Sequence, residues 1–349
     1  MRLPSMIVHC DWSTSSKKRW MSVAVLNESR YWLSKPMPVG SPRALLDALM
    51  SADPGPVLIG FDFPIGLPVQ YGEKTGLVDF RGCLAAFGHG AWADWFNVVD
   101  DVRDLSLHRP FYPTRPGGRS QAQLTSALGV SDINQLRRSC EMRTSSRAAA
   151  CPLFWTLGGN QVGKAALSGW REFLIPALET PGTALWPFDG SVASLLERSR
   201  LVIAETYPAD AYGQAGLVFK PGMSKTRRTD RQTFASTLMD WAENRKHGLD
   251  GGLVSSIRDG FGDQAVGEDI FDAFLGLCGM LEVVCGHRPE GVPTQPELVQ
   301  WEGWIFGQTS RAFSDGRTAE GSADRCGPFA PANRKSAPSS DRGLPNLLQ

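Results

Sequence analysis

The sequence of 349 residues has no excess of charge of either sign and is poor in histidine. Its 36 basic side chains balance its 36 acidic ones, and it contains only five histidines. Nucleic-acid-binding domains commonly show a basic excess, so any such surface here has to come from local clustering. Seven cysteines form no C-x-x-C pair, which argues against a structural zinc site.

Long apolar runs are also missing. No stretch reaches the roughly 18 apolar residues that a membrane-spanning helix needs, and the first short run, at 6–10, stops at Asp11. That run is also too short for the apolar part of a signal peptide. An odd number of scattered cysteines is typical of free thiols in a reducing compartment. We therefore expect a cytoplasmic protein that does not associate with membranes.

What the sequence does contain is a regular alternation of strand and helix signals. In the first 70 residues, apolar runs and turn residues predict three strands, a helix and a fourth strand, at 6–10, 20–26, 30–33, 41–49 and 57–61. Further on, the pattern predicts a short strand, then a strand and two helices, at 153–157, 201–204, 231–245 and 268–285. This order predicts an α/β fold with a mixed sheet flanked by helices.

The middle of the chain has a different character. Residues 70–198 are rich in glycine, proline, arginine and tryptophan and contain few periodic segments, so we interpret them as a large insertion in one domain at 1–308. The segment 309–349 has little apolar content, and we expect it to be disordered. The sequence does not indicate an oligomeric state.

Three of the predicted strands are followed at once by a carboxylate, namely by Asp11, Asp62 and Glu205. Near-continuous apolar runs are typical of strands that are buried on both faces, as in parallel sheets. Ligands of such sheets bind at the carboxyl ends of the strands, which meet at one edge. We therefore expect the three acids to gather there, although a single acid at a strand end is often only a turn former or a helix cap.

Two more acids lie in the helix predicted at 268–285. Asp269 and Asp272 are three residues apart and so share a helix face, and small residues at Gly276 and Gly279 continue the stripe of Asp272. We expect this stripe to face protein, where a carboxylate is costly unless it is paired or binds a metal ion. Clustered carboxylates without histidines suit Mg²⁺ or Mn²⁺. Two such ions can promote the hydrolysis of a phosphodiester bond.

The same acids lie in motifs that resemble a known family. The motifs are DWS at 11–13, GFDFPIGLP at 60–68, ETYPA at 205–209, DIFDAF at 269–274 and GWI at 303–305. The chain resembles the family called domain of unknown function 429, predicted nucleases of ribonuclease H-like fold. This resemblance implies that Asp11, Asp62, Asp269 and Asp272 are catalytic metal ligands and that Glu205 joins them. One departure is Trp12, because many relatives of the wider fold have glycine after the first acid.

Basic side chains outside the sheet are expected to bind the phosphates of DNA or RNA, which the sequence does not distinguish. The stretch from 103 to 147 has eight arginines against three acids, although these arginines are equally compatible with a solvated surface. The expected phosphate contacts are Arg137 and Arg138 in the insertion, Lys164 after a glycine-rich segment, and Lys225 and Arg228 after the Glu205 motif.

Other functions remain open at this level. The segment 158–164 matches the P-loop pattern G-x-x-x-x-G-K, but Ala165 replaces the serine or threonine that would bind Mg²⁺. The segment 11–17 is similar to the first phosphate loop of sugar kinases and actin-like ATPases, which predicts a second copy of the fold. A catalytically inactive nucleic-acid-binding module is the third alternative.

Overall fold

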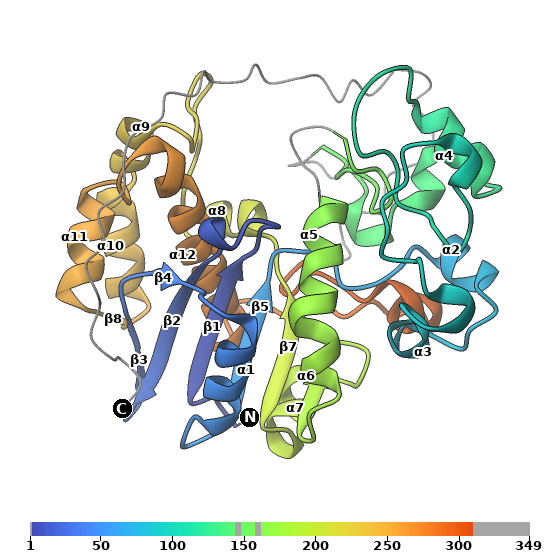
Figure 1. The fold of residues 1–349 in the computed structure, drawn as a ribbon. Helices are drawn as coiled ribbons and strands as arrows, with labels where there is room; N and C mark the ends of the chain where they lie inside the picture. The colour runs from blue at the N-terminus through green and yellow to red at the C-terminus, as the bar shows by residue number, and fades with distance from the viewer. Residues whose placement is uncertain (1, 144–147, 158–161, 310–349) are drawn as a thin grey trace.

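The fold is known from a computed structural model, which describes residues 2–143, 148–157 and 162–309 (Figure 1). The expected disorder of 309–349 concerns residues that, apart from Thr309, lie outside the described part, and so do 158–161 of the glycine-rich segment. The strands are β1 (Met6–Asp11), β2 (Trp20–Asn27), β3 (Arg30–Leu33), β4 (Met37–Pro38), β5 (Val57–Phe61), β6 (Thr183–Leu185), β7 (Leu201–Glu205) and β8 (Gly248–Leu249).

Twelve α-helices are present in the described residues. The helices of the first half are α1 (Pro42–Ser51), α2 (Val69–Lys74), α3 (Phe80–Ala86), α4 (Gln121–Ala127), α5 (Val162–Gly169) and α6 (Ile175–Leu178). Those of the second half are α7 (Val192–Arg198), α8 (Pro208–Gln214), α9 (Arg228–Gln232), α10 (Ala235–Asn244), α11 (Gly251–Arg258) and α12 (Gln264–Val284). A π-helical segment (Trp170–Leu174) joins α5 to α6.

The eight strands form one mixed sheet in the order β6-β7-β5-β1-β2-β3-β8, and β4 pairs with β2. As predicted, β1, β5 and β7 lie side by side and are parallel. In the described sheet only β2 runs in the opposite direction, because it is antiparallel to β1, β3 and β4. The α/β class and the mixed sheet expected from the sequence are therefore confirmed.

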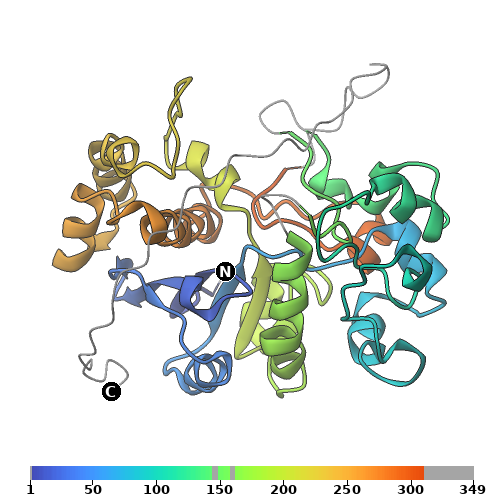
Figure 2. The same cartoon turned by 45° about the horizontal axis from the view of Figure 1, so that its top comes forward.

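Helices cover both faces of the sheet, which is why the central strands are apolar along their whole length. On one face, Val8, Ile59 and Ile203 pack in a core with α1, α5 and the π-helical segment. On the other face, alternate residues such as Ile7 and Val202 pack in a second core with α7, α10, α11 and α12. Figure 2 shows the sheet between these two layers, with α1 below it and α12 above it.

The longest helix, α12, approaches the sheet closely because glycines line its inner face. A Cβ atom on Gly276 would lie 2.1 Å from ring atoms of His9 on β1, and a Cβ atom on Gly279 would lie 2.9 Å from Ala211 on α8. The predicted stripe of Asp272 and the two glycines thus faces protein. This contact places the N-terminal part of α12 beside the end of β1.

Three local expectations need correction. The helix expected at 231–245 is divided into α9 and α10. The segment 153–157 forms no strand, only one isolated bridge between Trp155 and Tyr112. Within 70–198, β6 is a strand of the main sheet, beside β7, so the part that departs from the sheet is shorter than that range. Strands of two or three residues are too short to give a periodic signal.

The described part of the segment between α2 and Trp155 lies to one side of the sheet, beyond α5 and β7, in both views (Figures 1 and 2). It is largely irregular, with short helices, and its aromatic side chains extend the first core, where Trp95 stacks on Phe87 and on Trp170. In the described parts of the chain, no helix has both the length and the apolar character needed to cross a membrane.

Candidate active site

The carboxyl ends of β1 and β5 bring two acids together. Because the two strands pair in parallel, Asp11 and Asp62 leave the same edge of the sheet, and their carboxyl groups are hydrogen-bonded to each other. The backbone N–H of Trp12 donates to Oδ1 of Asp62 over 2.7 Å. A hydrogen bond between two carboxyl groups requires a proton on one of them, so this arrangement favours the singly protonated pair in the absence of a cation.

Burial is the main reason why protonation of one of these two carboxyl groups is favoured. Burial raises the pKa of Asp62 to about 7, against the lowering effect of the Trp12 hydrogen bond. Burial, followed by repulsion from Asp62, holds the pKa of Asp11 well above its usual range, and Asp272 and Asp269 raise it further. These electrostatic effects show that four of the five predicted acids are close enough to influence one another.

Asp272 on α12 is the third acid of this site, and its two oxygens have different partners. The Tyr212 hydroxyl donates to Oδ1, and the Lys225 ammonium donates to Oδ2. Lys225 also lies 3.1 Å from Glu268, one turn earlier on α12. Burial raises the pKa of Asp272, although Lys225 opposes that rise. Lys225 was predicted to contact phosphate, and the structure places it within the acidic cluster as a counter-ion.

Asp269 lies at the margin of the cluster. Burial raises its pKa to about 6, and the nearby Lys18 opposes this shift. Its Oδ2 atom is buried and has no hydrogen-bond partner among the described residues. A buried carboxylate oxygen without a partner is costly, which makes Asp269 a candidate for binding a further group in this site.

Glu205 is bound to partners outside the cluster of the other four acids. Its two oxygens accept hydrogen bonds of 2.6 Å from Nη1 and Nη2 of Arg138, and Oε2 also accepts one from the backbone N–H of Ile65. Both side chains are almost completely buried. The expected roles of Glu205 as a metal ligand and Arg138 as a phosphate contact are therefore replaced by a buried ion pair. This pair attaches the insertion to the end of β7.

Two other predicted phosphate contacts are also engaged elsewhere. Arg137 is buried and donates to the carbonyl of Ala150 and to the side chain of Asn134. Arg228 is paired with the Asp259 carboxylate and also donates to the Asp259 backbone carbonyl over 2.9 Å. Neither side chain lines the cavity beside the acids.

A cavity of about 500 Å³ opens above the acids. Its floor includes Asp62 and Asp272, and Lys164 and Lys225 lie in its wall. Sequence reasoning did not identify Tyr212 or Lys18, which also line it. Tyr212 lies on α8 within ordinary helical sequence, and no local pattern distinguishes it from a core tyrosine.

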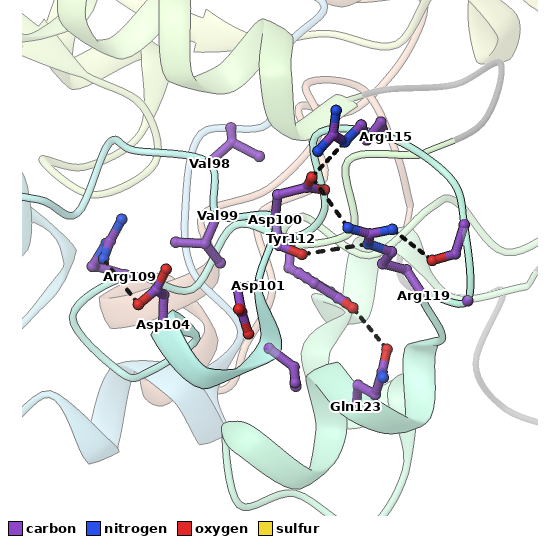
Figure 3. A pocket seen from close by; sticks show the side chains of 13 residues that line it. Val98, Val99, Asp100, Asp101, Asp104, Arg109, Tyr112, Arg115, Arg119 and Gln123 are labelled. Atoms are coloured by element: carbon purple, nitrogen blue, oxygen red, sulfur yellow. Dashed lines mark hydrogen bonds and ion pairs between the residues drawn. The ribbon is translucent and has the colours of Figure 1, made fainter.

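Arg109, Arg115 and Arg119 of the insertion line a different cavity, of about 610 Å³, shown in Figure 3. Arg115 and Arg119 both form ion pairs with Asp100, at 2.7 and 3.2 Å, and Arg109 lies 3.9 Å from Asp104. The basic excess counted from Arg103 omits Asp100 and Asp101, which immediately precede it in the chain. With these two acids included, the stretch has eight arginines against five acids, so its excess is reduced but remains.

Within the described residues, no three Asp, Glu, His or Cys side chains form a ready-made set of ligands for one metal ion. Asp11 and Asp62 are held by each other, and Asp272 is held by Tyr212 and Lys225. No protein-family model, curated protein or solved structure matches the chain.

Proposed function

We propose that the protein is a divalent-metal-dependent nuclease that hydrolyses phosphodiester bonds. The observation that carries this proposal is the hydrogen-bonded pair Asp11–Asp62, with Asp272 beside it, under a cavity that lysines also line. Adjacent buried carboxyl groups whose pKa values lie above their usual range are an unfavourable arrangement in the absence of a cation. Such arrangements are concentrated at functional sites.

The donor atoms of the pair fit Mg²⁺ or Mn²⁺. Both ions prefer oxygen ligands, and Mg²⁺ usually binds through one or two carboxylates while it keeps several waters. Asp11 and Asp62 supply two carboxylates from rigid strands, and Asp269 has a buried oxygen without a partner in the described structure. Lys225 already neutralises Asp272, so we assign the metal to Asp11 and Asp62 first. Bound there, the metal would activate water and stabilise negative charge on phosphate.

The remaining residues of the cavity have distinct roles in this proposal. The backbone N–H of Trp12 orients Asp62, and the buried Trp12 ring packs 5.5 Å from Phe61. Lys164 and Lys225 would hold the phosphate, whose charge the acids would otherwise repel. In the reaction, water forms a new P–O bond, the ester P–O bond breaks, and the leaving oxygen takes up a proton.

The sheet supports a ribonuclease H-like fold as the finer assignment. In that plan the acids follow the first and fourth long strands and lie on a late helix. Here they follow β1 and β5 and lie on α12, and the antiparallel β2 lies next to β1. The sugar-kinase and actin-like alternative requires a second copy of the fold, whereas the described residues form a single sheet. Gly163 of the P-loop-like segment packs against the Leu153 carbonyl, where a Cβ atom would lie 2.1 Å away. Close packing therefore accounts for this glycine without a bound phosphate.

The test is a cleavage assay on labelled DNA and RNA, as single strands and duplexes, with Mg²⁺, Mn²⁺ or EDTA and with ATP hydrolysis measured in parallel. We expect cleavage that requires metal and is abolished in Asp11→Asn and Asp62→Asn. Asp47→Asn, an exposed acid on α1, is the matched control and should cleave like the wild type. ATP hydrolysis without strand cleavage would favour the kinase-like alternative. An inactive module would show neither reaction and no Mn²⁺-dependent rise in melting temperature.

A further inference from the structure

A third cavity, of about 470 Å³, continues from the candidate active site along α5 and the π-helical segment that follows it. Thr14 and Lys164 line both this cavity and that of the candidate active site, so the two adjoin. The third cavity is also lined by Leu167 and Arg171 and by Phe96 and Val98 of the insertion. We call this third cavity the α5 groove.

The α5 groove has two cationic side chains without a carboxylate partner among the described residues. Lys164 and Arg171 form no ion pair there, and the Arg171 guanidinium lies over the Phe96 ring. The one carboxylate in the groove, Glu172, is bound by Arg19 through two hydrogen bonds, of 2.6 and 3.0 Å. The charges of Lys164 and Arg171 are therefore available to an anion. This contrasts with the arginines of the insertion, which are paired with Asp100 and Asp104.

The spacing of the two cations indicates an anion longer than one phosphate. Lys164 and Arg171 are seven residues apart on one continuous helical segment, which is two turns and about 10 Å along its axis. They therefore lie on the same side of the helix at different depths of the groove. A chain with repeated phosphates can contact both, one phosphate at each.

Phe96, which also lines the groove, offers a surface for a base. Phe96 is half-buried and is held edge-on against Trp95, and the Arg171 guanidinium lies 5.8 Å from the centre of its ring. Aromatic rings and arginine planes are the side chains on which unpaired bases stack. With a volume typical of a small-ligand site, the groove suits one strand and not a duplex.

We infer that the α5 groove binds a single-stranded segment of nucleic acid next to the bond to be cleaved. The inference rests on the proposed nuclease function for the reaction in the adjoining cavity. Binding itself requires only the groove. Lys164 and Arg171 contact successive phosphates, and Phe96 stacks on a base between them. A substrate with an unpaired end or flap is then bound in preference to an uninterrupted duplex.

The test measures binding without cleavage. Labelled single-stranded and duplex oligonucleotides of the same sequence are titrated in EDTA, and fluorescence anisotropy gives Kd at several salt concentrations. We expect tighter binding of the single strand. In Lys164→Ala with Arg171→Ala, affinity should fall at least tenfold, and the slope of log Kd against log salt should decrease by about 0.7 for each lost contact. Phe96→Leu should weaken binding about tenfold without changing that slope.

Matched controls and a cleavage assay separate this inference from the proposed function. Arg43→Ala removes an exposed arginine of α1 and should bind like the wild type. Circular dichroism and melting temperature confirm that each variant is folded. If the double variant keeps its affinity and salt slope, or if the wild type binds no single strand, the inference is wrong even where cleavage is observed. If single strands bind through the groove but no metal supports cleavage, the inference stands and the nuclease proposal fails.

Discussion

Nη1 and Nη2 of Arg138 each lie 2.6 Å from one oxygen of Glu205, so the guanidinium and the carboxylate meet as a two-pronged pair. Arg138 Nη1 also donates to the carbonyls of Ile65 and Glu302. One buried cation thus connects β7, the loop after β5, the insertion and the C-terminal part of the described chain. These segments are far apart in sequence, and the pair fixes how the insertion meets the edge of the sheet.

The first prediction concerns this pair. Arg138→Met leaves the Glu205 carboxylate buried and without its cation, so the free energy of unfolding should fall by about 3–5 kcal/mol. Arg138→Met with Glu205→Met should lose less than the sum of the two single variants, because the double variant has no unpaired carboxylate at position 205; buried Glu141, which lies 2.9 Å from Arg138, loses its cation in both Arg138 variants. Urea denaturation measures both. Arg103→Ala removes an exposed pair with Asp101 and should change stability by less than about 1 kcal/mol. Additive losses for the buried pair would contradict this account.

The second prediction concerns Lys225. Burial disfavours its charge, but the Asp272 and Glu268 carboxylates together outweigh burial and raise the pKa of Lys225, which therefore stays cationic. A divalent ion in the site has to share the acids with this ammonium. Lys225→Met should therefore bind Mn²⁺ about tenfold more tightly by titration calorimetry while cleavage falls, because a phosphate contact is lost. Lys220→Met, an exposed lysine nearby, is the control, and unchanged Mn²⁺ affinity in Lys225→Met would show that the ammonium does not compete.

The third prediction concerns the approach of α12 to β1. A methyl group on Gly276 would lie 2.1–2.4 Å from ring atoms of His9, whose nitrogens are bonded to the Ala273 carbonyl and the Thr206 hydroxyl. Gly276→Ala should therefore lower the free energy of unfolding by about 1–3 kcal/mol, because it overpacks the contact. Gly213→Ala in α8 has open space around the added methyl and should stabilise by about 0.5–1 kcal/mol. Thermal unfolding measures the melting temperatures of both variants, and equal shifts from the wild type would contradict this prediction.

The fourth prediction concerns pH. Burial lowers the pKa of His247 from 6.5 to about 4, and Glu282 only partly opposes this shift. The folded protein keeps His247 neutral while the unfolded chain protonates it below about pH 6.5, so stability falls as the pH drops from 6.5 towards 4. His247→Phe keeps the ring beside Trp241, 5.2 Å away, and removes this proton. The free energy of unfolding, measured in urea at pH 5, 6 and 7, should decrease less steeply with falling pH in this variant than in the wild type. The difference in slope should correspond to at most one proton taken up on unfolding. Identical slopes for the two proteins would refute the assignment.

Much of the sheet could be predicted because its signals are local. The apolar runs that became β1, β5 and β7 are long enough to require burial on both faces, and burial on both faces favours parallel neighbours. The acids after β1 and β5 then had to leave the sheet at one edge. Helix α12 could be predicted from the helical spacing of its apolar residues, and the close approach of its glycine stripe from the spacing of the glycines.

The remaining features depend on contacts between distant residues. That Glu205 follows a strand is visible in the sequence, but its partner Arg138 is 67 residues away, and the two meet only because the insertion folds over the end of β7. The same holds for Lys225, whose segment returns to α12 and neutralises Asp272.

The sequence by itself thus determined the α/β class, the three parallel strands and the convergence of Asp11 and Asp62, because backbone periodicity and burial act over a few neighbouring residues. Only the tertiary structure decided which charges are already paired, since an ion pair depends on positions that no local pattern encodes. In the structure, Glu205, Arg137 and Arg138 have partners outside the candidate site. Lys164 lines the cavity and has no ion-pair partner among the described residues. Arg171 lines the adjoining groove, although its neighbours in the chain give no indication of this position.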